Sequence, residues 1–179
     1  LFDGCEITSL NRVEMKKARR RMQMIFQDPY SCLDPRKTIL DIISEPLKVH
    51  GLGNEHEINK KVKEALEQVD LSISEQFIKK IPEELSGGQR QRVGIARALV
   101  IQPEFIVADE PVSMLDASVK ADIVSLMMDL KEKNNLTYVF ITHEIALAYH
   151  ICDRIAVMYL GEMVEKGSVK DVIQSPAHP

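Results

Sequence analysis

Two short segments of this chain carry residue types suited to binding a phosphate and a divalent cation. The first, Leu85-Ser86-Gly87-Gly88-Gln89, places two glycines directly before a predicted helix. Glycine lets the backbone approach a ligand closely, and the free amides and dipole at a helix start attract anions. The segment therefore predicts an anion site suited to a γ-phosphate, with Ser86 adding a hydroxyl donor. The same letters also fit a plain turn in which Ser86 caps the helix.

The second segment, from Phe105 to Glu110, is a short apolar run that closes on two acids before Pro111. A strand that ends in carboxylates suits magnesium and water chemistry. Asp109 can hold a hydrated magnesium ion, and Glu110 can polarise an attacking water as a general base. The alternative is a surface turn in which acids simply precede a proline.

Three further polar positions lie at predicted strand or helix ends: Gln27, His143 and Asp116. An amide such as that of Gln27 can contact magnesium or the lytic water, and an imidazole such as that of His143 can reach a γ-phosphate. Asp116, at the end of the Ser113–Asp116 segment, would bring a carboxylate near the same region. Each also fits a structural role, at a strand end for Gln27 and His143 and as a helix cap for Ser113–Asp116.

The elements that must position these residues alternate between strand and helix. Buried strands are predicted at 22–26, 105–108 and 138–142, and a short strand and turn at 1–8. Helical patterns cover 11–21, 39–81, 89–99 and 118–133, and a hairpin is predicted around Gly161. In the helix at 118–133, the side chains expected to face inward are Val119, Ile123, Leu126, Met127 and Leu130. This alternation predicts an open α/β sheet, whose ligands bind beyond the carboxyl ends of its strands.

The region from 28 to 97 carries no strand signal and is predicted to be a mainly helical insertion. We therefore expect a core formed by 1–27 and 98–179 and a helical subdomain at 28–97. The chain is 45% hydrophobic and 28% charged, which is ordinary for a soluble globular protein. Its formal net charge of −4 argues against a basic nucleic-acid footprint. The three scattered cysteines predict reduced thiols, and no apolar run approaches the roughly 20 residues of a membrane span.

Together these segments resemble the ATP-binding subunits of ABC transporters. Gln27, Leu85–Gln89, Phe105–Glu110, Ser113-Met114-Leu115-Asp116 and Thr142-His143 occur in the order and rough spacing of the glutamine loop, signature motif, Walker B motif, aspartate loop and switch histidine. The subtype resembles the oligopeptide/dipeptide importers through Phe26-Gln27-Asp28-Pro29-Tyr30, Leu33-Asp34-Pro35-Arg36 and the terminal Ser175-Pro176-Ala177-His178-Pro179. Met114 and Glu144 are mild departures, since Ala and Asp are usual there.

The resemblance implies an α/β, P-loop NTPase-like core with a mainly helical subdomain, and ATP and Mg²⁺ as ligands. By carry-over, Glu110 is the general base, His143 the γ-phosphate contact, and Asp109 and Gln27 the magnesium and water contacts. The nucleotide contacts are Ser86, Gly87, Gly88, Gln89 and Asp116. In the family two such subunits pair head to tail, so the signature motif serves the ATP held by the partner. Transmembrane permease subunits, attachment to the cytoplasmic face of the membrane and no nucleic-acid partner are also implied.

One element of the family pattern does not occur in the sequence. A P-loop, or Walker A motif, needs Gly-x-x-x-x-Gly-Lys-Ser/Thr, and the chain contains no Gly-Lys dipeptide. Leu1-Phe2-Asp3-Gly4 resembles the stretch that follows the P-loop helix, so we expect the P-loop and its strand to precede residue 1 and this chain alone to be inactive. Two alternatives stay open: a non-catalytic fragment or degenerate subunit that binds partners, and a soluble ABC ATPase outside transport.

Overall fold

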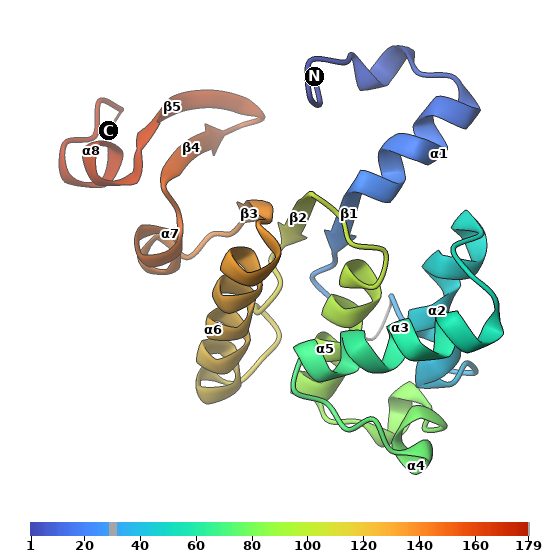
Figure 1. Cartoon of the computed structure of the whole chain (residues 1–179). Coiled ribbons are helices and arrows are strands. Elements are labelled where there is room, and N and C mark those ends of the chain that lie inside the picture. The colour runs from blue at the N-terminus through green and yellow to red at the C-terminus, as the bar shows by residue number, and fades with distance from the viewer. Residues whose placement is uncertain (29–31, 179) are drawn as a thin grey trace. The chain divides into compact units, whose positions relative to one another are not determined.

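The computed structural model describes residues 1–28 and 32–178 and divides into two compact units, Leu1–Val139 and Phe140–Pro179 (Figure 1). The predicted turn after Gln27 falls partly on Pro29, Tyr30 and Ser31, and these residues and Pro179 lie outside the described part. The division at 139/140 differs from the predicted boundaries at 28 and 97, which stay a prediction. Each unit is described by itself.

A three-stranded sheet in the order β1-β2-β3 forms the centre of the first unit. Its strands are β1 (Met22–Ile25), β2 (Phe105–Asp109) and β3 (Thr137–Ile141), whose last two residues belong to the second unit. β1 and β2 run parallel, with Met22 opposite Phe105 and Ile25 opposite Ala108. Strands form at the three predicted places, as expected for an α/β fold. The carboxyl ends of β1 and β2 consequently meet at one edge of the sheet.

The two faces of this sheet differ in burial. Ile25, Ile106 and Ala108 share one face and are at most 2% exposed, and α5 packs against β1. On β1 and β3, Met24 is 40% and Val139 45% exposed. The prediction of buried strands at 22–26 and 138–142 is therefore wrong for these side chains. An apolar run shows that a strand has a buried face, but it does not show whether the second face is covered.

Helices α2 (Ile39–His50), α3 (Glu55–Gln68), α4 (Glu75–Ile78) and α5 (Gly87–Leu99) follow β1 and contribute a common core. Figure 1 shows α2 to α5 gathered beside the sheet, and Ile43, Leu66 and Val93 are fully buried among them. The described residues between β1 and β2 form helices and turns but no strand. α2 ends at Gly51, whose φ of 66° places it in the left-handed conformation that glycine adopts without strain.

The first residues do not form the strand predicted at 1–8. A single bridge joins Phe2 to Cys5, followed by the 3₁₀ helix η1 (Ile7–Ser9). Asp3 and Gly4 have φ values of 50° and 77°, the positive angles of a tight two-residue turn, but the chain after Cys5 enters η1 instead of continuing as a strand. Helix α1 (Arg12–Arg21) then leads into β1, and Asn11 and Glu14 close its start with a capping box.

Two more helical elements complete the first unit: η2 (Pro82–Glu84), which precedes α5, and α6 (Ala117–Asn134), which follows β2. The side chains of α6 that are buried as predicted are Ile123, Leu126, Met127 and Leu130. Val119 is only half-buried, so the prediction that its side chain faces inward holds only in part. It lies at the start of the helix, where it meets the backbone of α5 rather than the core.

The second unit contains α7 (Ile145–Ile151), β4 (Arg154–Tyr159), β5 (Glu162–Ser168) and α8 (Val169–Gln174). β4 and β5 pair antiparallel, which confirms the hairpin predicted around Gly161. Leu160 and Gly161 connect them with φ values of 48° and 85°, the positive angles that a tight two-residue hairpin turn requires. Nowhere in 1–28 or 32–178 is a helix both long and apolar enough to span a bilayer.

Candidate functional site

The side chains of Gln27 and Glu110 meet where β1 and β2 end. Nε2 of Gln27 donates a hydrogen bond of 2.7 Å to Oε2 of Glu110. The two residues are 83 positions apart in the chain, and the parallel pairing of the strands brings them together. Because the amide nitrogen makes this bond, the amide oxygen of Gln27 is the atom suited to a cation or a water hydrogen. The structure thus joins two of the predicted site residues.

The backbone at Glu110 adopts an uncommon conformation. Its φ is 42°, in the left-handed region that few residues other than glycine occupy. The Glu110 carbonyl accepts hydrogen bonds from the amide (3.2 Å) and the hydroxyl (3.1 Å) of Ser113. Such strain persists only where the surroundings impose it, and Ser113 supplies that constraint here. The chain therefore turns sharply after Asp109 and presents Glu110 at the sheet edge.

Asp109 is the last residue of β2 and lies directly before Glu110. Among residues 1–28 and 32–178, no group of three or more His, Cys, Asp or Glu side chains is placed to hold a metal ion. Magnesium, however, is commonly bound through one or two carboxylates together with waters and substrate phosphates. The oxygen donors of Asp109 and Gln27 are of the type that such an ion takes.

The glycine pair lies at the start of α5, which has 13 residues. Ser86 occupies the N-cap, where its hydroxyl accepts from the Gln89 amide at 3.3 Å, while Gln89 Oε1 accepts from the Ser86 amide at 3.1 Å. The capping role considered for Ser86 is therefore real. It does not use the hydroxyl hydrogen, which stays able to donate to an anion. The amides of Gly87 and Gly88 lie in the first turn of α5, at the positive end of the helix dipole.

Close packing explains why residue 88 is glycine. A Cβ built on Gly88 would lie 2.6 Å from Cγ1 of Val119, a distance that real Cβ atoms essentially never show. A Cβ on Gly87 would meet Leu115 at an ordinary 3.5 Å. The first turn of α5 therefore lies against Leu115 and the start of α6. Asp116, in that segment, takes the N-cap position of α6, but its side chain makes no capping hydrogen bond.

His143 belongs to the second unit. It lies between β3 and α7, and the neighbouring Thr142 hydroxyl accepts a hydrogen bond of 3.0 Å from the Glu144 amide. This bond fixes the turn that carries the imidazole. The contact expected between His143 and a γ-phosphate stays a prediction.

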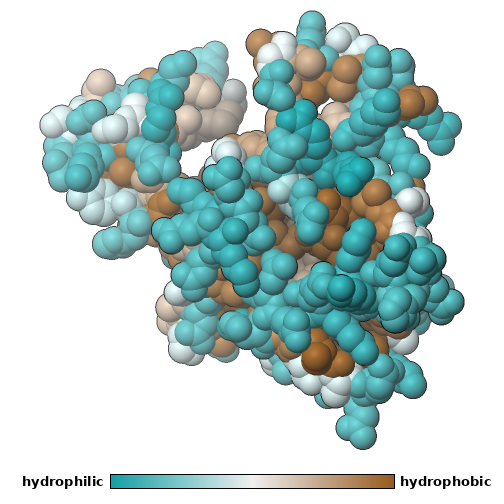
Figure 2. All heavy atoms as spheres, viewed as in Figure 1, coloured by the Kyte–Doolittle hydropathy of each residue, from teal (hydrophilic) through white to brown (hydrophobic). Residues whose placement is uncertain are grey.

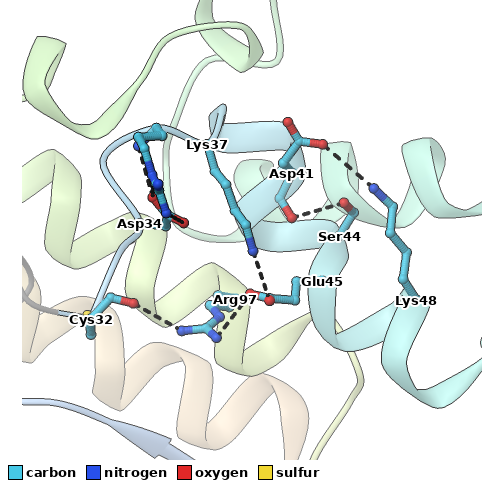
Figure 3. Close-up of polar contacts among 9 residues, drawn as sticks. Cys32, Asp34, Lys37, Asp41, Ser44, Glu45, Lys48 and Arg97 are labelled. Carbon is cyan, nitrogen blue, oxygen red and sulfur yellow. Dashed lines mark hydrogen bonds and ion pairs between the residues drawn. The ribbon is translucent and has the colours of Figure 1, made fainter.

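A network of ion pairs and hydrogen bonds in the first unit was not predicted. Arg97 of α5 donates to the Cys32 carbonyl and to Glu45 of α2, each at 3.3 Å, and Lys37 donates to the other Glu45 oxygen at 3.0 Å (Figure 3). The network joins residues 32–37 and α2 to α5, the helix that begins at the glycine pair. Burial raises the pKa of the Cys32 thiol, although the charge of Arg97 opposes this.

Comparisons with known proteins point to one family. The sequence model of the family described as ABC transporter matches residues 1–113. A putative peptide import ATP-binding protein of Brucella ovis is 48% identical over 179 residues, covering 100% of this chain and 56% of the relative. The oligopeptide transport ATP-binding protein AppF of Bacillus subtilis is 48% identical over 180 residues, covering 100% of this chain and 54% of that protein.

Solved structures agree with the sequence relatives. cbiO1 from Clostridium perfringens, part of the ABC transporter complex cbiONQ, superposes with a TM-score of 0.84 at 30% identity, covering 98% of this chain and 67% of that one. An ATP-binding cassette in a dimeric, post-hydrolysis state with ADP and Pi gives a TM-score of 0.78 at 33% identity, covering 94% of this chain and 72% of that one. The chain spans about half the length of the curated relatives it matches, 56% in the first case.

Proposed function

The chain belongs to the ABC transporter family, and from that premise we propose that it forms part of an ATP-binding and ATP-hydrolysing subunit that powers an importer. The proposed cargo is an oligopeptide or dipeptide, because relatives 48% identical are named as peptide import and oligopeptide transport ATP-binding proteins. The observation that carries the proposal is the hydrogen bond between Gln27 and Glu110 at the carboxyl edge of the sheet.

The proposed roles follow from the chemistry of each side chain. Glu110 takes a proton from the attacking water as general base, and Gln27 orients that water through its amide oxygen. Asp109 and the same amide oxygen would hold Mg²⁺, which would neutralise charge on the phosphates. His143 donates to the γ-phosphate. Catalysis of phosphoryl transfer depends mainly on positioning the reactants and on stabilising charge in the transition state. The proposed side chains would contribute to both.

The start of α5 serves a second subunit in this proposal. Ser86, Gly87, Gly88 and Gln89 bind the ATP held by a partner ATPase, with Asp116 in the adjoining segment. The dimeric state of the cassette with ADP and Pi supports a pair of such subunits. The capping box fixes the amides of the first turn, so little reorganisation is needed when a phosphate approaches.

Permease subunits and the cytoplasmic face of the membrane complete the proposed assembly. The complex that contains cbiO1 supports the idea of a multi-subunit transporter. The insertion predicted around Pro29 to Glu45, of which the structure describes turns at 32–38 and the first half of α2, faces the permease in this proposal. The ion pair between Glu45 of α2 and Arg97 of α5 would link the permease-facing segment to the helix of the ATP site.

Transport by the assembled complex tests the proposal. A subunit containing this sequence and a P-loop is reconstituted with its permease in proteoliposomes, and ATP-dependent uptake of labelled oligopeptides is compared with uptake of a sugar and of Ni²⁺. Peptide uptake that stops with Glu110→Gln supports the proposal. Uptake of the sugar or Ni²⁺ alone would overturn the peptide assignment, and ATP hydrolysis with no permease partner would favour an ATPase outside transport.

A second candidate concerns the 179-residue chain by itself. The sequence contains no Gly-Lys dipeptide and thus no P-loop lysine. We propose that this polypeptide alone binds partners and does not hydrolyse ATP. Steady magnesium-dependent turnover by the purified chain, lost with Glu110→Gln, would refute this candidate.

A further inference from the structure

Helix α1 carries an unusual concentration of positive charge. Within Arg12–Arg21 the basic residues are Arg12, Lys16, Lys17, Arg19, Arg20 and Arg21, and the one acid is Glu14. No residue of α1 is buried, although the chain as a whole has a formal net charge of −4. Figure 2 shows the surface formed by this part of the chain as largely hydrophilic. The charge is therefore local and faces solvent.

The spacing of these residues gathers the charge on one side of the helix. Arg12, Lys16, Arg19 and Arg20 follow one another at i, i+4, i+7 and i+8, the spacing of a single helix face. We call these four residues the basic face of α1. Like charges three and four residues apart repel and destabilise an isolated helix. The stripe thus has a local cost that contact with an anion would relieve.

Nothing that the structure describes neutralises the basic face. Across residues 1–28 and 32–178, its four side chains form no ion pair, whereas Arg21 turns to Glu104 at 2.7 Å and Asp3 at 2.9 Å. Glu14 is engaged with the Asn11 amide in the capping box. Of the six cations of α1, Arg21 is therefore ion-paired, and the four residues of the basic face, like Lys17, are not, within the described part of the chain.

The end of a second helix, α2, lies beside this positive region. His50 lies in the last turn of α2, and its pKa is lowered first by burial and then by the charges of Lys16 and Arg20. Lys48, two residues earlier, is paired with Asp41 at 3.6 Å. The charges of Lys16 and Arg20 are thus felt at the end of α2, and the positive potential that these cations create is suited to phosphate groups.

We propose that the basic face of α1 docks on the anionic phospholipid headgroups of a membrane surface. This inference rests on the proposed function, which places the subunit at the membrane. A stripe of four cations on an exposed helix matches a plane of headgroup phosphates. Val13, 67% exposed and three residues before Lys16, adds an apolar side chain for the interface. A duplex nucleic acid is disfavoured because it would extend beyond the stripe over a chain of net negative charge.

Vesicle flotation with the 179-residue chain tests the proposal. Protein bound to vesicles rises with them, whereas aggregated protein sinks. The vesicles are pure phosphatidylcholine or contain one quarter phosphatidylglycerol. The test variant is Lys16→Gln/Arg19→Gln/Arg20→Gln. The matched control, Lys60→Gln/Lys63→Gln/Lys133→Gln, removes the same charge from α3 and α6. Glutamine keeps a similar helix propensity, and circular dichroism checks the fold.

Each basic residue at an anionic surface contributes about fivefold to binding, so the test variant should lose roughly 100-fold in partitioning to anionic vesicles. The control should change by no more than about threefold. Binding should require phosphatidylglycerol and weaken as salt is added. Equal loss in both variants, binding to phosphatidylcholine alone, no flotation, or displacement by duplex DNA at equal phosphate concentration would overturn the inference.

ATP hydrolysis by a subunit that contains this sequence and a P-loop, measured without lipid for the same variants, separates this inference from the proposed function. Normal hydrolysis without vesicle binding would overturn the proposed docking surface and leave the proposed function intact. Vesicle binding by a subunit that does not hydrolyse ATP would overturn the proposed function and support the lipid contact.

Discussion

The amide of Gln27 and the carboxylate of Glu110 are joined by a 2.7 Å hydrogen bond between residues that follow neighbouring parallel strands. This contact couples the residue proposed to orient water to the residue proposed to deprotonate it.

Gln27→Glu should shift the pH dependence of ATP hydrolysis in a subunit that contains a P-loop. Two carboxylates at this distance disfavour double ionisation, so one pKa of the pair rises. The base must be ionised to act, and the rising limb of the pH–rate profile therefore moves to higher pH. Gln27→Ala serves as control, since it removes the amide without adding a charge. Superimposable profiles for wild type and Gln27→Glu would show that Glu110 is not the titrating base.

Gly88→Ala should destabilise the first unit by about 1–3 kcal/mol, because its Cβ would overlap Val119. Chemical denaturation measures this. Gly94→Ala is the matched control in the same helix: a Cβ there meets nothing within 4 Å, so it should stabilise by about 0.5–1 kcal/mol. Adding Val119→Ala should restore much of the stability lost in Gly88→Ala. Equal effects of the two glycine substitutions would contradict the packing argument.

Arg97→Ala and Glu45→Gln should each weaken the attachment of the 32–38 segment to α5. Both side chains are partly exposed, at 32% and 39%, so the coupling energy in a double-mutant cycle should be modest, about 0.5–1 kcal/mol. Protease cleavage near Cys32 should accelerate in both single variants. Lys60→Gln removes a charge from α3 and should change neither measurement. Additive effects of Arg97→Ala and Glu45→Gln would mean that the two side chains do not interact.

Local features of the fold were predictable from the letters alone. The Ser86 to Gln89 sequence matches the Ser/Thr-x-x-Glu/Gln pattern of a capping box, and the structure contains one. Gly161 between two apolar runs indicated a hairpin, and β4 and β5 form it. These features depend on residues a few positions apart, whose conformational preferences act directly on the backbone.

Contacts between segments far apart in the chain were harder to predict from the sequence. The pairing of Gln27 with Glu110 could be expected from parallel strands that end at one edge. The link from Arg97 to Glu45 and the contact of Gly88 with Val119 belong to no periodic pattern, because they arise from how helices pack. Exposure of Met24 and Val139 was missed for a related reason: hydrophobicity records the residue type, while burial depends on what covers the sheet.

The most direct test of the account is ATP binding and hydrolysis by Glu110→Gln in a subunit that contains this sequence and a P-loop. Glutamine keeps the shape of the side chain and removes the base. The account predicts ATP binding close to wild type and a turnover lowered by roughly 100-fold or more. The control Glu132→Gln, on the exposed surface of α6, should leave both unchanged. Turnover by Glu110→Gln within a few-fold of wild type would contradict the account.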